Sequence, residues 1–236
     1  MSTTPPLILD FAGSTILPAT GTIHVYRVDL SGDDAFRQSA EWDLLSADER
    51  ARAERLVRAR DGRKFVKCRG ALRSILGGLS HVAPDSVAFE VGPGGKPMLP
   101  DGPWRFNVSH SGELALIAVA QNVELGVDVE EYRTIQQSDR IVESYFTAAE
   151  SAEFRRLDED DRSEAFIRGW TRKEAVVKAQ GVGLAGLATE FETLFGAGRP
   201  PEAFRLCEPM DEVRGWRLWE VSPRPGYVAT LAVAID

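Results

Sequence analysis

The sequence has few cysteines, no long apolar run and no basic residue near its start. Its two cysteines, Cys68 and Cys207, lack the Cys-x-x-Cys spacing of many zinc and redox sites, so we expect neither a disulfide framework nor a cysteine-rich zinc site. The longest apolar run, from Leu114 to Ala120, is too short to cross a bilayer. No lysine or arginine precedes Arg27, which argues against a secretory signal peptide. These features predict a cytoplasmic protein with no membrane partner.

The sequence also lacks the glycine patterns of nucleotide-binding loops and an excess of basic residues. It contains neither a Walker motif nor a dinucleotide-binding glycine motif. The formal net charge is −8, which argues against wholesale nucleic-acid binding, because that calls for a basic surface. What is present, 43% hydrophobic and 27% charged residues in 236, is the composition of a globular protein with one large domain or two modest ones.

The negative charge is not spread evenly along the chain. Ten basic and three acidic residues lie between Glu49 and Arg73, so this stretch carries +7 and the remainder carries −15. A solvated helix face is the commoner explanation of such a run. A basic segment inside an acidic protein is also suited to one local anionic ligand.

Apolar periodicity predicts a mixture of helices and strands. A capping-box pattern at Ser46 and Glu49 opens a helix through about Arg60, and a second helix runs from about Gly62 to Leu76, ended by Gly77-Gly78. Helical patterning returns over residues 138–180. Strands are predicted near residues 22–29, 86–91, 104–109, 114–120, 124–130, 203–207, 215–222 and 226–235.

A weak internal repeat suggests how these elements are organised. A shift of 101 positions places residues 45–66 over residues 146–167, with six identities in 22 positions. Two amphipathic helices share composition anyway, but each copy is also followed by strands, which favours a duplicated half of helices and a sheet. In this register Arg73 lies over Glu174, so the first half would present cations where the second presents acids.

Two pairs of charged residues could carry chemistry. Asp128 and Glu130 are two apart on a predicted strand, so their carboxylates share a face and could hold Mg²⁺; exposed acids at a strand exit are the commoner explanation. Glu174 and Lys178 are four apart on a predicted helix and also share a face, for which an exposed ion pair is the usual explanation.

A third candidate is His110, which lies between Ser109 and Ser111 at the end of a predicted strand. A histidine flanked by two hydroxyls could bind a phosphate or shuttle a proton. Taken alone, the tripeptide is better explained by a structural histidine.

In their order and intervals, these segments resemble the 4′-phosphopantetheinyl transferases of the larger, surfactin-synthetase-activating type. The matching stretches are Gly95-Lys-Pro97, Phe106-Asn-Val-Ser-His-Ser111, Gly126-Val-Asp-Val-Glu130 and Trp170-Thr-Arg-Lys-Glu174 followed by Lys178, with a looser match over Leu45–Arg73. The resemblance implies an α+β fold in which two similar α/β halves are related by a pseudo-twofold axis within a monomer. We expect the first half to be residues 1–122, with the basic helix and the residues that hold coenzyme A. We expect the second half to be residues 123–236, with the metal-binding acids.

The resemblance also implies an activity and a set of site residues. The activity is Mg²⁺-dependent transfer of the 4′-phosphopantetheine arm of coenzyme A to a serine of an acyl or peptidyl carrier protein, with release of 3′,5′-ADP, in carrier activation for secondary-metabolite synthesis. The implied ligands of Mg²⁺, or alternatively Mn²⁺, are Asp128, Glu130 and Glu174. The implied catalytic residues are Glu174, as third ligand or general base, Lys178 and His110. The implied coenzyme A contacts are Arg52, Lys64, Gly95, Lys96, Pro97, Ser109, His110 and Lys178.

One residue departs from the family pattern, and two other classes of function stay open. Glu49 stands where relatives often carry a lysine, so the 3′-phosphate would be held by fewer charges or by Arg50 and Arg52. The alternatives are another Mg²⁺-dependent phosphotransferase or phosphohydrolase acting on a nucleotide, and a non-catalytic carrier-binding protein. Carrier docking is expected between the halves, near residues 132–147, where apolar contacts could come from Ile135, Ile141, Tyr145 and Phe146.

Overall fold

The computed structural model describes residues 23–92, 95–181, 191–193, 195, 205–206 and 215–235. Its α-helices are α1 (Ala40–Asp43), α2 (Ala47–Arg55), α3 (Ala59–Ser80), α4 (Ser138–Tyr145), α5 (Ala148–Arg155) and α6 (Glu159–Gln180), with 3₁₀ turns at Phe36–Gln38 and Pro84–Ser86. Its strands are β1 (His24–Asp29), β2 (Glu90–Val91), β3 (Pro97–Met98), β4 (Trp104–Ser111), β5 (Leu114–Gln121), β6 (Leu125–Glu131), β7 (Phe191–Glu192), β8 (Arg205–Leu206), β9 (Gly215–Val221) and β10 (Tyr227–Ile235). Parts of the predicted strands near residues 22–29 and 203–207 lie outside the described residues.

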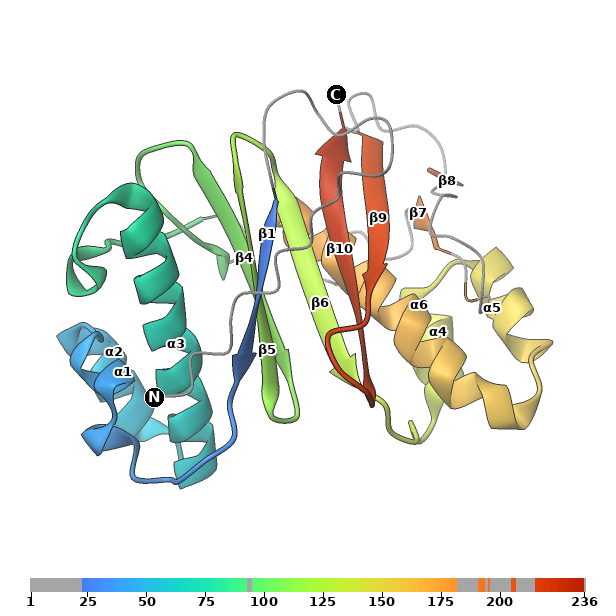
Figure 1. Ribbon diagram of the computed structural model, residues 1–236. Helices are drawn as coiled ribbons and strands as arrows, with labels where there is room; N and C mark the ends of the chain where they lie inside the picture. Colours follow the sequence, from blue (N-terminus) through green and yellow to red (C-terminus); the bar gives the residue numbers. More distant parts are fainter. Residues whose placement is uncertain are drawn as a thin grey trace.

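The same topology occurs twice (Figure 1). One antiparallel sheet has the strand order β1-β5-β4 and the other has the order β6-β10-β9. In each sheet the first strand in sequence pairs with the last, and helices and a short two-stranded ladder intervene along the chain. The predicted α+β fold of two similar halves is therefore confirmed.

The main hydrophobic core lies between the two sheets. Alternate residues of β5, such as Leu116 and Ala118, pack against Val127 and Val129 of β6 and Leu231 of β10, and all five are almost completely buried. The other residues of β5 face α3, while α6 covers the far side of the β6-β10-β9 sheet. Because both faces of β5 are covered, its sequence is a continuous apolar run rather than an alternating one.

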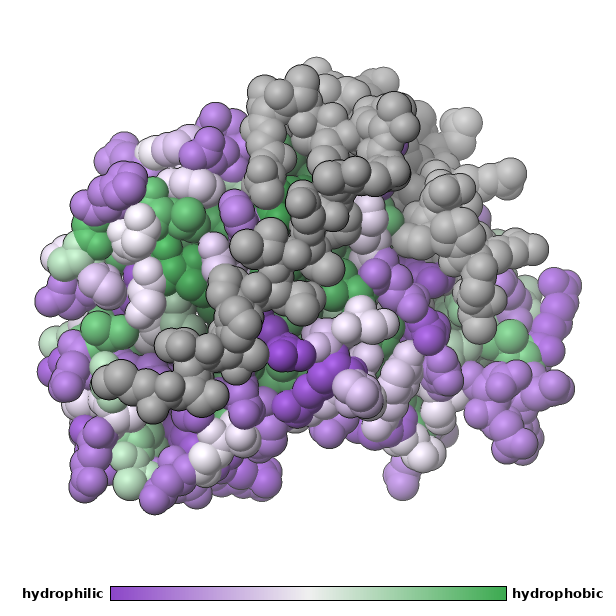
Figure 2. All heavy atoms as spheres, in the orientation of Figure 1, coloured by the Kyte–Doolittle hydropathy of each residue, from purple (hydrophilic) through white to green (hydrophobic). Residues whose placement is uncertain are grey.

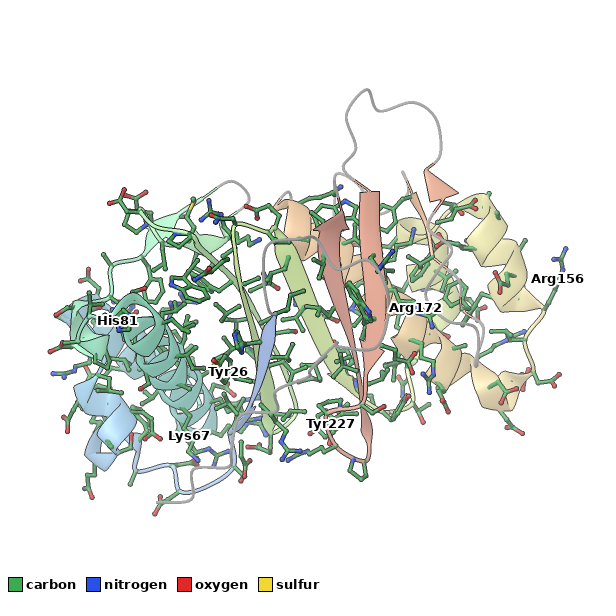
Figure 3. The ribbon with its side chains drawn as sticks, turned by 45° about the horizontal axis from the view of Figure 1, so that its top comes forward. Tyr26, Lys67, His81, Arg156, Arg172 and Tyr227 are labelled. Atoms are coloured by element: carbon green, nitrogen blue, oxygen red, sulfur yellow. The ribbon has the colours of Figure 1, made fainter. Side chains whose placement is uncertain are left out.

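The outer ends of the molecule are polar. Hydrophilic side chains gather around α5 and the start of α6 (Figure 2), and Arg156 points away from the protein (Figure 3). Arg172 instead lies against β9, where it pairs with Glu220. No helix in the described part of the chain is long and apolar enough to span a membrane.

Capping boxes start the equivalent helices α2 and α5. The side chains of Ser46 and Glu49 exchange hydrogen bonds with each other's backbone N–H, as predicted, and Thr147 and Glu150 do the same 101 residues later. The first helix ends at Arg55 instead of Arg60, since the chain becomes extended at the next residue.

Two predictions about α3 are wrong. The helix does not stop at Gly77-Gly78 but continues to Ser80 and ends at His81, whose φ is 56°. Gly77 is required for another reason: a Cβ there would stand 2.9 Å from the carbonyl oxygen of Val82. The helices α3 and α6 begin 100 residues apart, not 101, so the placement of Arg73 over Glu174 is also wrong.

The structural counterpart of Arg73 is Lys173. Each of these cations pairs with the glutamate of the capping box in its own half, Arg73 with Glu49 at 2.6 Å and Lys173 with Glu150 at 2.8 Å. The one-residue offset places Glu174, rather than Lys173, on the accessible side of α6. The duplicated halves thus share a buried ion pair and differ in what the next residue presents.

The expected apolar docking contacts are only partly accessible. Phe146 is 3% exposed and packs in the core of α4, α5 and α6, so its assignment as a docking contact is wrong. Ile135 and Ile141 are partly buried against the same core. Tyr145 is 37% exposed and makes an edge-to-face contact with Trp170.

Candidate active site

The site begins where β6 lies directly against α6. A Cβ at Gly126 would overlap the carbonyl oxygen of Ala175 and stand 2.5 Å from the nitrogen of Ala179. Only glycine permits this approach, because any other side chain would force the strand away from the helix. The contact brings the acids that follow Gly126 next to Glu174 and Lys178 on α6.

Asp128 projects from β6 into a polar, buried environment. Its Oδ1 accepts hydrogen bonds from Lys178 Nζ at 2.6 Å and from Ser109 Oγ at 2.8 Å. Burial raises the pKa of this carboxyl above its usual value, and the ammonium of Lys178 opposes that rise. Its second oxygen, Oδ2, is buried without a hydrogen-bond partner among the described residues.

Glu130 lies on the same face of β6 but nearer the surface. Its Oε2 accepts a hydrogen bond from Ser111 Oγ at 2.6 Å and is 3.1 Å from Arg133 Nη1. The intervening Val127 and Val129 point into the core, as the alternation of the strand predicts.

Glu174 differs from the two acids of β6 in its hydrogen bonding. Within the described part of the chain it makes no hydrogen bond or ion pair, although it lines a cavity of about 240 Å³ together with Lys178 and Asn107. Burial, followed by the negative charge of Asp128, raises its pKa from 4.5 to about 7. An unpaired carboxylate whose pKa is raised toward neutral pH is suited to accepting a proton or binding a cation.

A second, larger cavity of about 500 Å³ adjoins the first, because Pro97 and Val108 line both. Its walls also carry Arg52, Lys64, Phe65, Cys68, Arg69 and His110. Glu174 of α6, in the smaller cavity, therefore lies beside the basic residues of α2 and α3 that line the larger one. The basic stretch noticed in the sequence therefore has a concave surface on which an anionic ligand could lie.

The cations of this cavity are not equivalent. Lys64 Nζ donates to the carbonyl oxygen of Gly112 at 2.7 Å and pairs with Glu113 at 2.9 Å. Arg69 lies 3.5 Å from Glu49. Arg52 has no carboxylate partner among the described residues and stacks on the ring of Phe65, 5.0 Å from its centroid.

Glu49 has a structural role in this region. Besides its capping bond to Ser46, it accepts a hydrogen bond from the buried guanidinium of Arg73. Glu49 therefore forms ion pairs with two arginines and also caps the start of α2. The departure from the family pattern is thus explained locally by ion pairs with Arg69 and Arg73.

His110 exposes its ring toward the larger cavity. Desolvation lowers its pKa below the usual value, and the positive charges of Lys178 and Lys64 lower it further. The imidazole is therefore mainly neutral at pH 7.

The predicted loop contacts Gly95, Lys96 and Pro97 line the smaller cavity. The ammonium of Lys96, however, donates to the carbonyl oxygens of Leu125 and Ala179. This lysine thereby ties the loop to β6 and to the end of α6.

The residues around Glu174 fit a divalent cation in donor chemistry. Asp128 contributes a buried carboxylate oxygen with no partner, and Glu174 contributes an unpaired carboxylate, both of the hard oxygen type that Mg²⁺ prefers. Among the described residues, no three acidic, histidine or cysteine side chains are gathered around one point. Lys178 instead neutralises Asp128, and Glu130 is turned toward Ser111 and Arg133.

Sequence reasoning missed two contributors to this site. Asn107 lines the smaller cavity, and its Oδ1 accepts the backbone N–H of Val127 at 2.9 Å. Glu113 neutralises Lys64 and also Arg63. The polar alternation of residues 107, 109 and 111 on one strand was the signal that could have identified Asn107.

The comparisons with known proteins agree with this arrangement. Residues 124–232 match the model of the 4′-phosphopantetheinyl transferase superfamily, and residues 35–122 match that of the 4′-phosphopantetheinyl transferase N-terminal region. The 4′-phosphopantetheinyl transferase HetI of Nostoc is 36% identical over 216 residues, which cover 90% of this chain and 87% of HetI. The 4′-phosphopantetheinyl transferase Sfp of Bacillus subtilis is 27% identical over 143 residues, 60% of this chain and 62% of Sfp. The chain belongs to the 4′-phosphopantetheinyl transferase superfamily.

Proposed function

We propose that this protein transfers the 4′-phosphopantetheine arm of coenzyme A to a serine hydroxyl of an acyl or peptidyl carrier protein and releases 3′,5′-ADP. The observation that carries the proposal is Glu174, an unpaired carboxylate with a pKa of about 7 beside Lys178, where an acidic site meets a basic cavity. Family membership and the names of the relatives support the same reaction.

In this proposal Glu174 is placed to accept the proton of the carrier serine. The attack forms a bond between the serine oxygen and the β-phosphorus, and the bond from that phosphorus to the bridging oxygen breaks. The ammonium of Lys178 donates two hydrogen bonds, to Asp128 and Ser109. Its third N–H can donate to the oxygens on which negative charge builds up. The carboxylate of Glu174 is close to the ideal for a general base at neutral pH.

We further propose that Asp128 and Glu130 hold Mg²⁺, or Mn²⁺ in its place, and that Glu174 is the third ligand in the alternative to its role as the base. The orphaned oxygen of Asp128 and the excess of negative charge around Glu174 support this assignment. When bound, the ion would neutralise charge on the pyrophosphate. Substituting Asp128 with alanine should first raise the Mg²⁺ concentration needed for activity, whereas Glu174→Gln should abolish transfer.

The basic cavity is proposed to hold the nucleotide end of coenzyme A. Arg52 is the best placed to bind a phosphate, because it pairs with no carboxylate among the described residues. Lys64 and His110 line the same cavity. Gly95, Lys96 and Pro97 line the smaller cavity, Pro97 also lines the larger one, and Ser109 is bonded to Lys178.

Further features of the proposal concern organisation. We propose that residues 1–122 and 123–236 are the two halves, supported by the repeated topology and by the two family-model matches. We also propose that the protein acts as a monomer in the cytoplasm on carriers of secondary-metabolite synthesis. A monomer is supported because both halves, and hence the cavities between them, come from one chain.

The test is incubation with coenzyme A, Mg²⁺ and a panel of apo carriers from fatty-acid, polyketide and nonribosomal-peptide synthesis. At least one carrier should gain the mass of the phosphopantetheine arm. No gain on any carrier, together with failure to bind coenzyme A, would overturn the proposal.

A further inference from the structure

The strands β4 and β6 meet along the boundary between the two sheets without pairing through their backbones. Each lies at the edge of its own sheet, β4 in the order β1-β5-β4 and β6 in the order β6-β10-β9. An edge strand has a row of backbone N–H groups that need acceptors when they are buried.

Side chains of β4 supply these acceptors at regular intervals. The N–H of Val127 donates to Asn107 Oδ1 at 2.9 Å, and the N–H of Val129 donates to Ser109 Oγ at 3.3 Å. The N–H of Glu131 donates to Ser111 Oγ at 3.2 Å. Each step is two residues on both strands, so one face of β4 follows one edge of β6 in a parallel register. We call Asn107, Ser109 and Ser111 the β4 ladder.

Each of the two serines of the β4 ladder also forms a hydrogen bond with the acid that directly precedes the residue whose amide it accepts. Ser109 Oγ donates to Asp128 Oδ1 at 2.8 Å, and Ser111 Oγ donates to Glu130 Oε2 at 2.6 Å. A hydroxyl can accept from a backbone N–H and donate to a carboxylate at the same time, which neither alanine nor a carboxylate can do. Each serine therefore fixes the strand and the direction of one acid together.

The β4 ladder lies almost out of solvent. Asn107, Ser109 and Ser111 are 7%, 5% and 8% exposed. Hydrogen bonds in such a position are strong, and losing an acceptor leaves a buried N–H unsatisfied. The whole of β6 is paired with β10 along its other edge, so the β4 ladder acts on the edge of β6 that has no strand partner in its own sheet.

We propose that Asn107 and Ser111, with Ser109 between them, are positioning residues that set the register of β6 across the boundary between the halves and hold Asp128 and Glu130 in fixed orientations near Glu174. The proposal rests on the proposed function for its catalytic consequence, but not for the ladder itself. A slip of β6 by one residue would turn both acids toward the core and put Val127 and Val129 in their place. The polar alternation in Asn107-Val-Ser-His-Ser111 thereby acquires a structural reason beyond contact with a ligand.

The test compares Ser111→Ala with Ser111→Thr, which keeps the hydroxyl. The control is Ser151→Ala, which removes another buried serine hydroxyl, bonded to the carbonyl oxygen of Val142 far from the cavity. A second variant, Asn107→Leu, removes the acceptor for Val127 without touching either acid. Ser109 is left unchanged, because it also contacts Lys178.

The first readout is residue-resolved amide hydrogen exchange, measured by NMR on the full chain without ligands. Ser111→Ala should accelerate exchange of the Glu131 amide about tenfold, and Asn107→Leu should do the same for Val127, while Ser111→Thr and Ser151→Ala leave both near the wild-type rate. A uniform rise across β5, β6 and β10 would indicate general destabilisation and would overturn the ladder, as would no change at these two amides.

The second readout is the binding of MnCl₂ in the presence of coenzyme A, followed by electron paramagnetic resonance. Ser111→Ala should weaken Mn²⁺ binding about tenfold, and Ser111→Thr should bind Mn²⁺ within about twofold of the wild-type affinity. In steady-state kinetics, the KM of Ser111→Ala for coenzyme A should change little. Wild-type affinity in Ser111→Ala would overturn the positioning role. If the wild-type protein binds no Mn²⁺ and modifies no carrier, the proposed function fails and the positioning role fails with it, whereas the exchange pattern still decides whether the ladder exists.

Discussion

Replacing Glu174 with glutamine should inactivate the protein and at the same time stabilise it. The substitution keeps the size of the side chain but removes a carboxylate whose pKa is raised to about 7 by burial and by Asp128. Loss of a general base lowers a rate by about 10²–10⁴-fold. We therefore expect carrier modification by Glu174→Gln to fall at least a hundredfold.

The stability gain follows from the same raised pKa. A folded-state pKa of about 7 against 4.5 when unfolded means that the folded protein binds the proton more tightly between these pH values. Wild-type stability should therefore fall as the pH rises from 4.5 to 7, at a full cost of about 3 kcal/mol. Because the side chain is partly exposed, solvent screening reduces the expected cost to about 1–2 kcal/mol.

The assay is urea unfolding of wild type and Glu174→Gln, with a chelator present, at pH 5 and pH 8. At pH 8 the variant should be more stable by about 1–2 kcal/mol, and at pH 5 most of this difference should disappear. Equal stability at pH 8, or a difference that does not depend on pH, would refute the electrostatic reasoning. Activity of the variant above a tenth of wild type would refute the role of Glu174 as a base.

Three further substitutions probe other parts of the account. Arg52→Ala should raise the KM for coenzyme A about tenfold or more with a smaller effect on kcat, because it removes a charge-assisted contact worth about 1.5–3 kcal/mol; an unchanged KM in steady-state kinetics would exclude that contact. Lys173→Met should destabilise the fold by about 3–5 kcal/mol in urea, since it leaves the buried Glu150 without its cation; a loss below 1 kcal/mol would contradict this. Gly126→Ala should lower the Tm strongly, because a Cβ would overlap α6, and a variant as stable as wild type in calorimetry would show that the strand can move away.

Much of the fold was predictable because local patterns and the tertiary structure agree. The capping box at Ser46, the core-facing Val127 and Val129, and the continuous apolar run of β5 all reflect short-range rules that burial reinforces. The end of α3 was not predictable in the same way. Gly77 resembles a helix stop, but its lack of a side chain is needed for contact with the segment at Val82, which only the tertiary structure reveals.

In the candidate site, too, some residues could be identified from the sequence, whereas their contacts could not. The family resemblance pointed to Asp128 and Glu174, and in the structure Glu174 lines the smaller cavity and lies close enough to Asp128 for their charges to interact. The partners of the candidate coenzyme A lysines, Lys64 and Lys96, could not be predicted from the sequence, because they are residues far away in the chain. The contact of Lys96 with Ala179, and that of Lys64 with Glu113, each require knowledge of how separate elements pack.

The most direct measurement is the release of 3′,5′-ADP from coenzyme A with an apo carrier, with the same carrier lacking its acceptor serine, and with no carrier. The account predicts release equal, mole for mole, to the phosphopantetheine gained by the intact carrier, and background release in the other two reactions. Release without an acceptor serine would instead identify a phosphohydrolase. No release under any condition would contradict the proposed transfer.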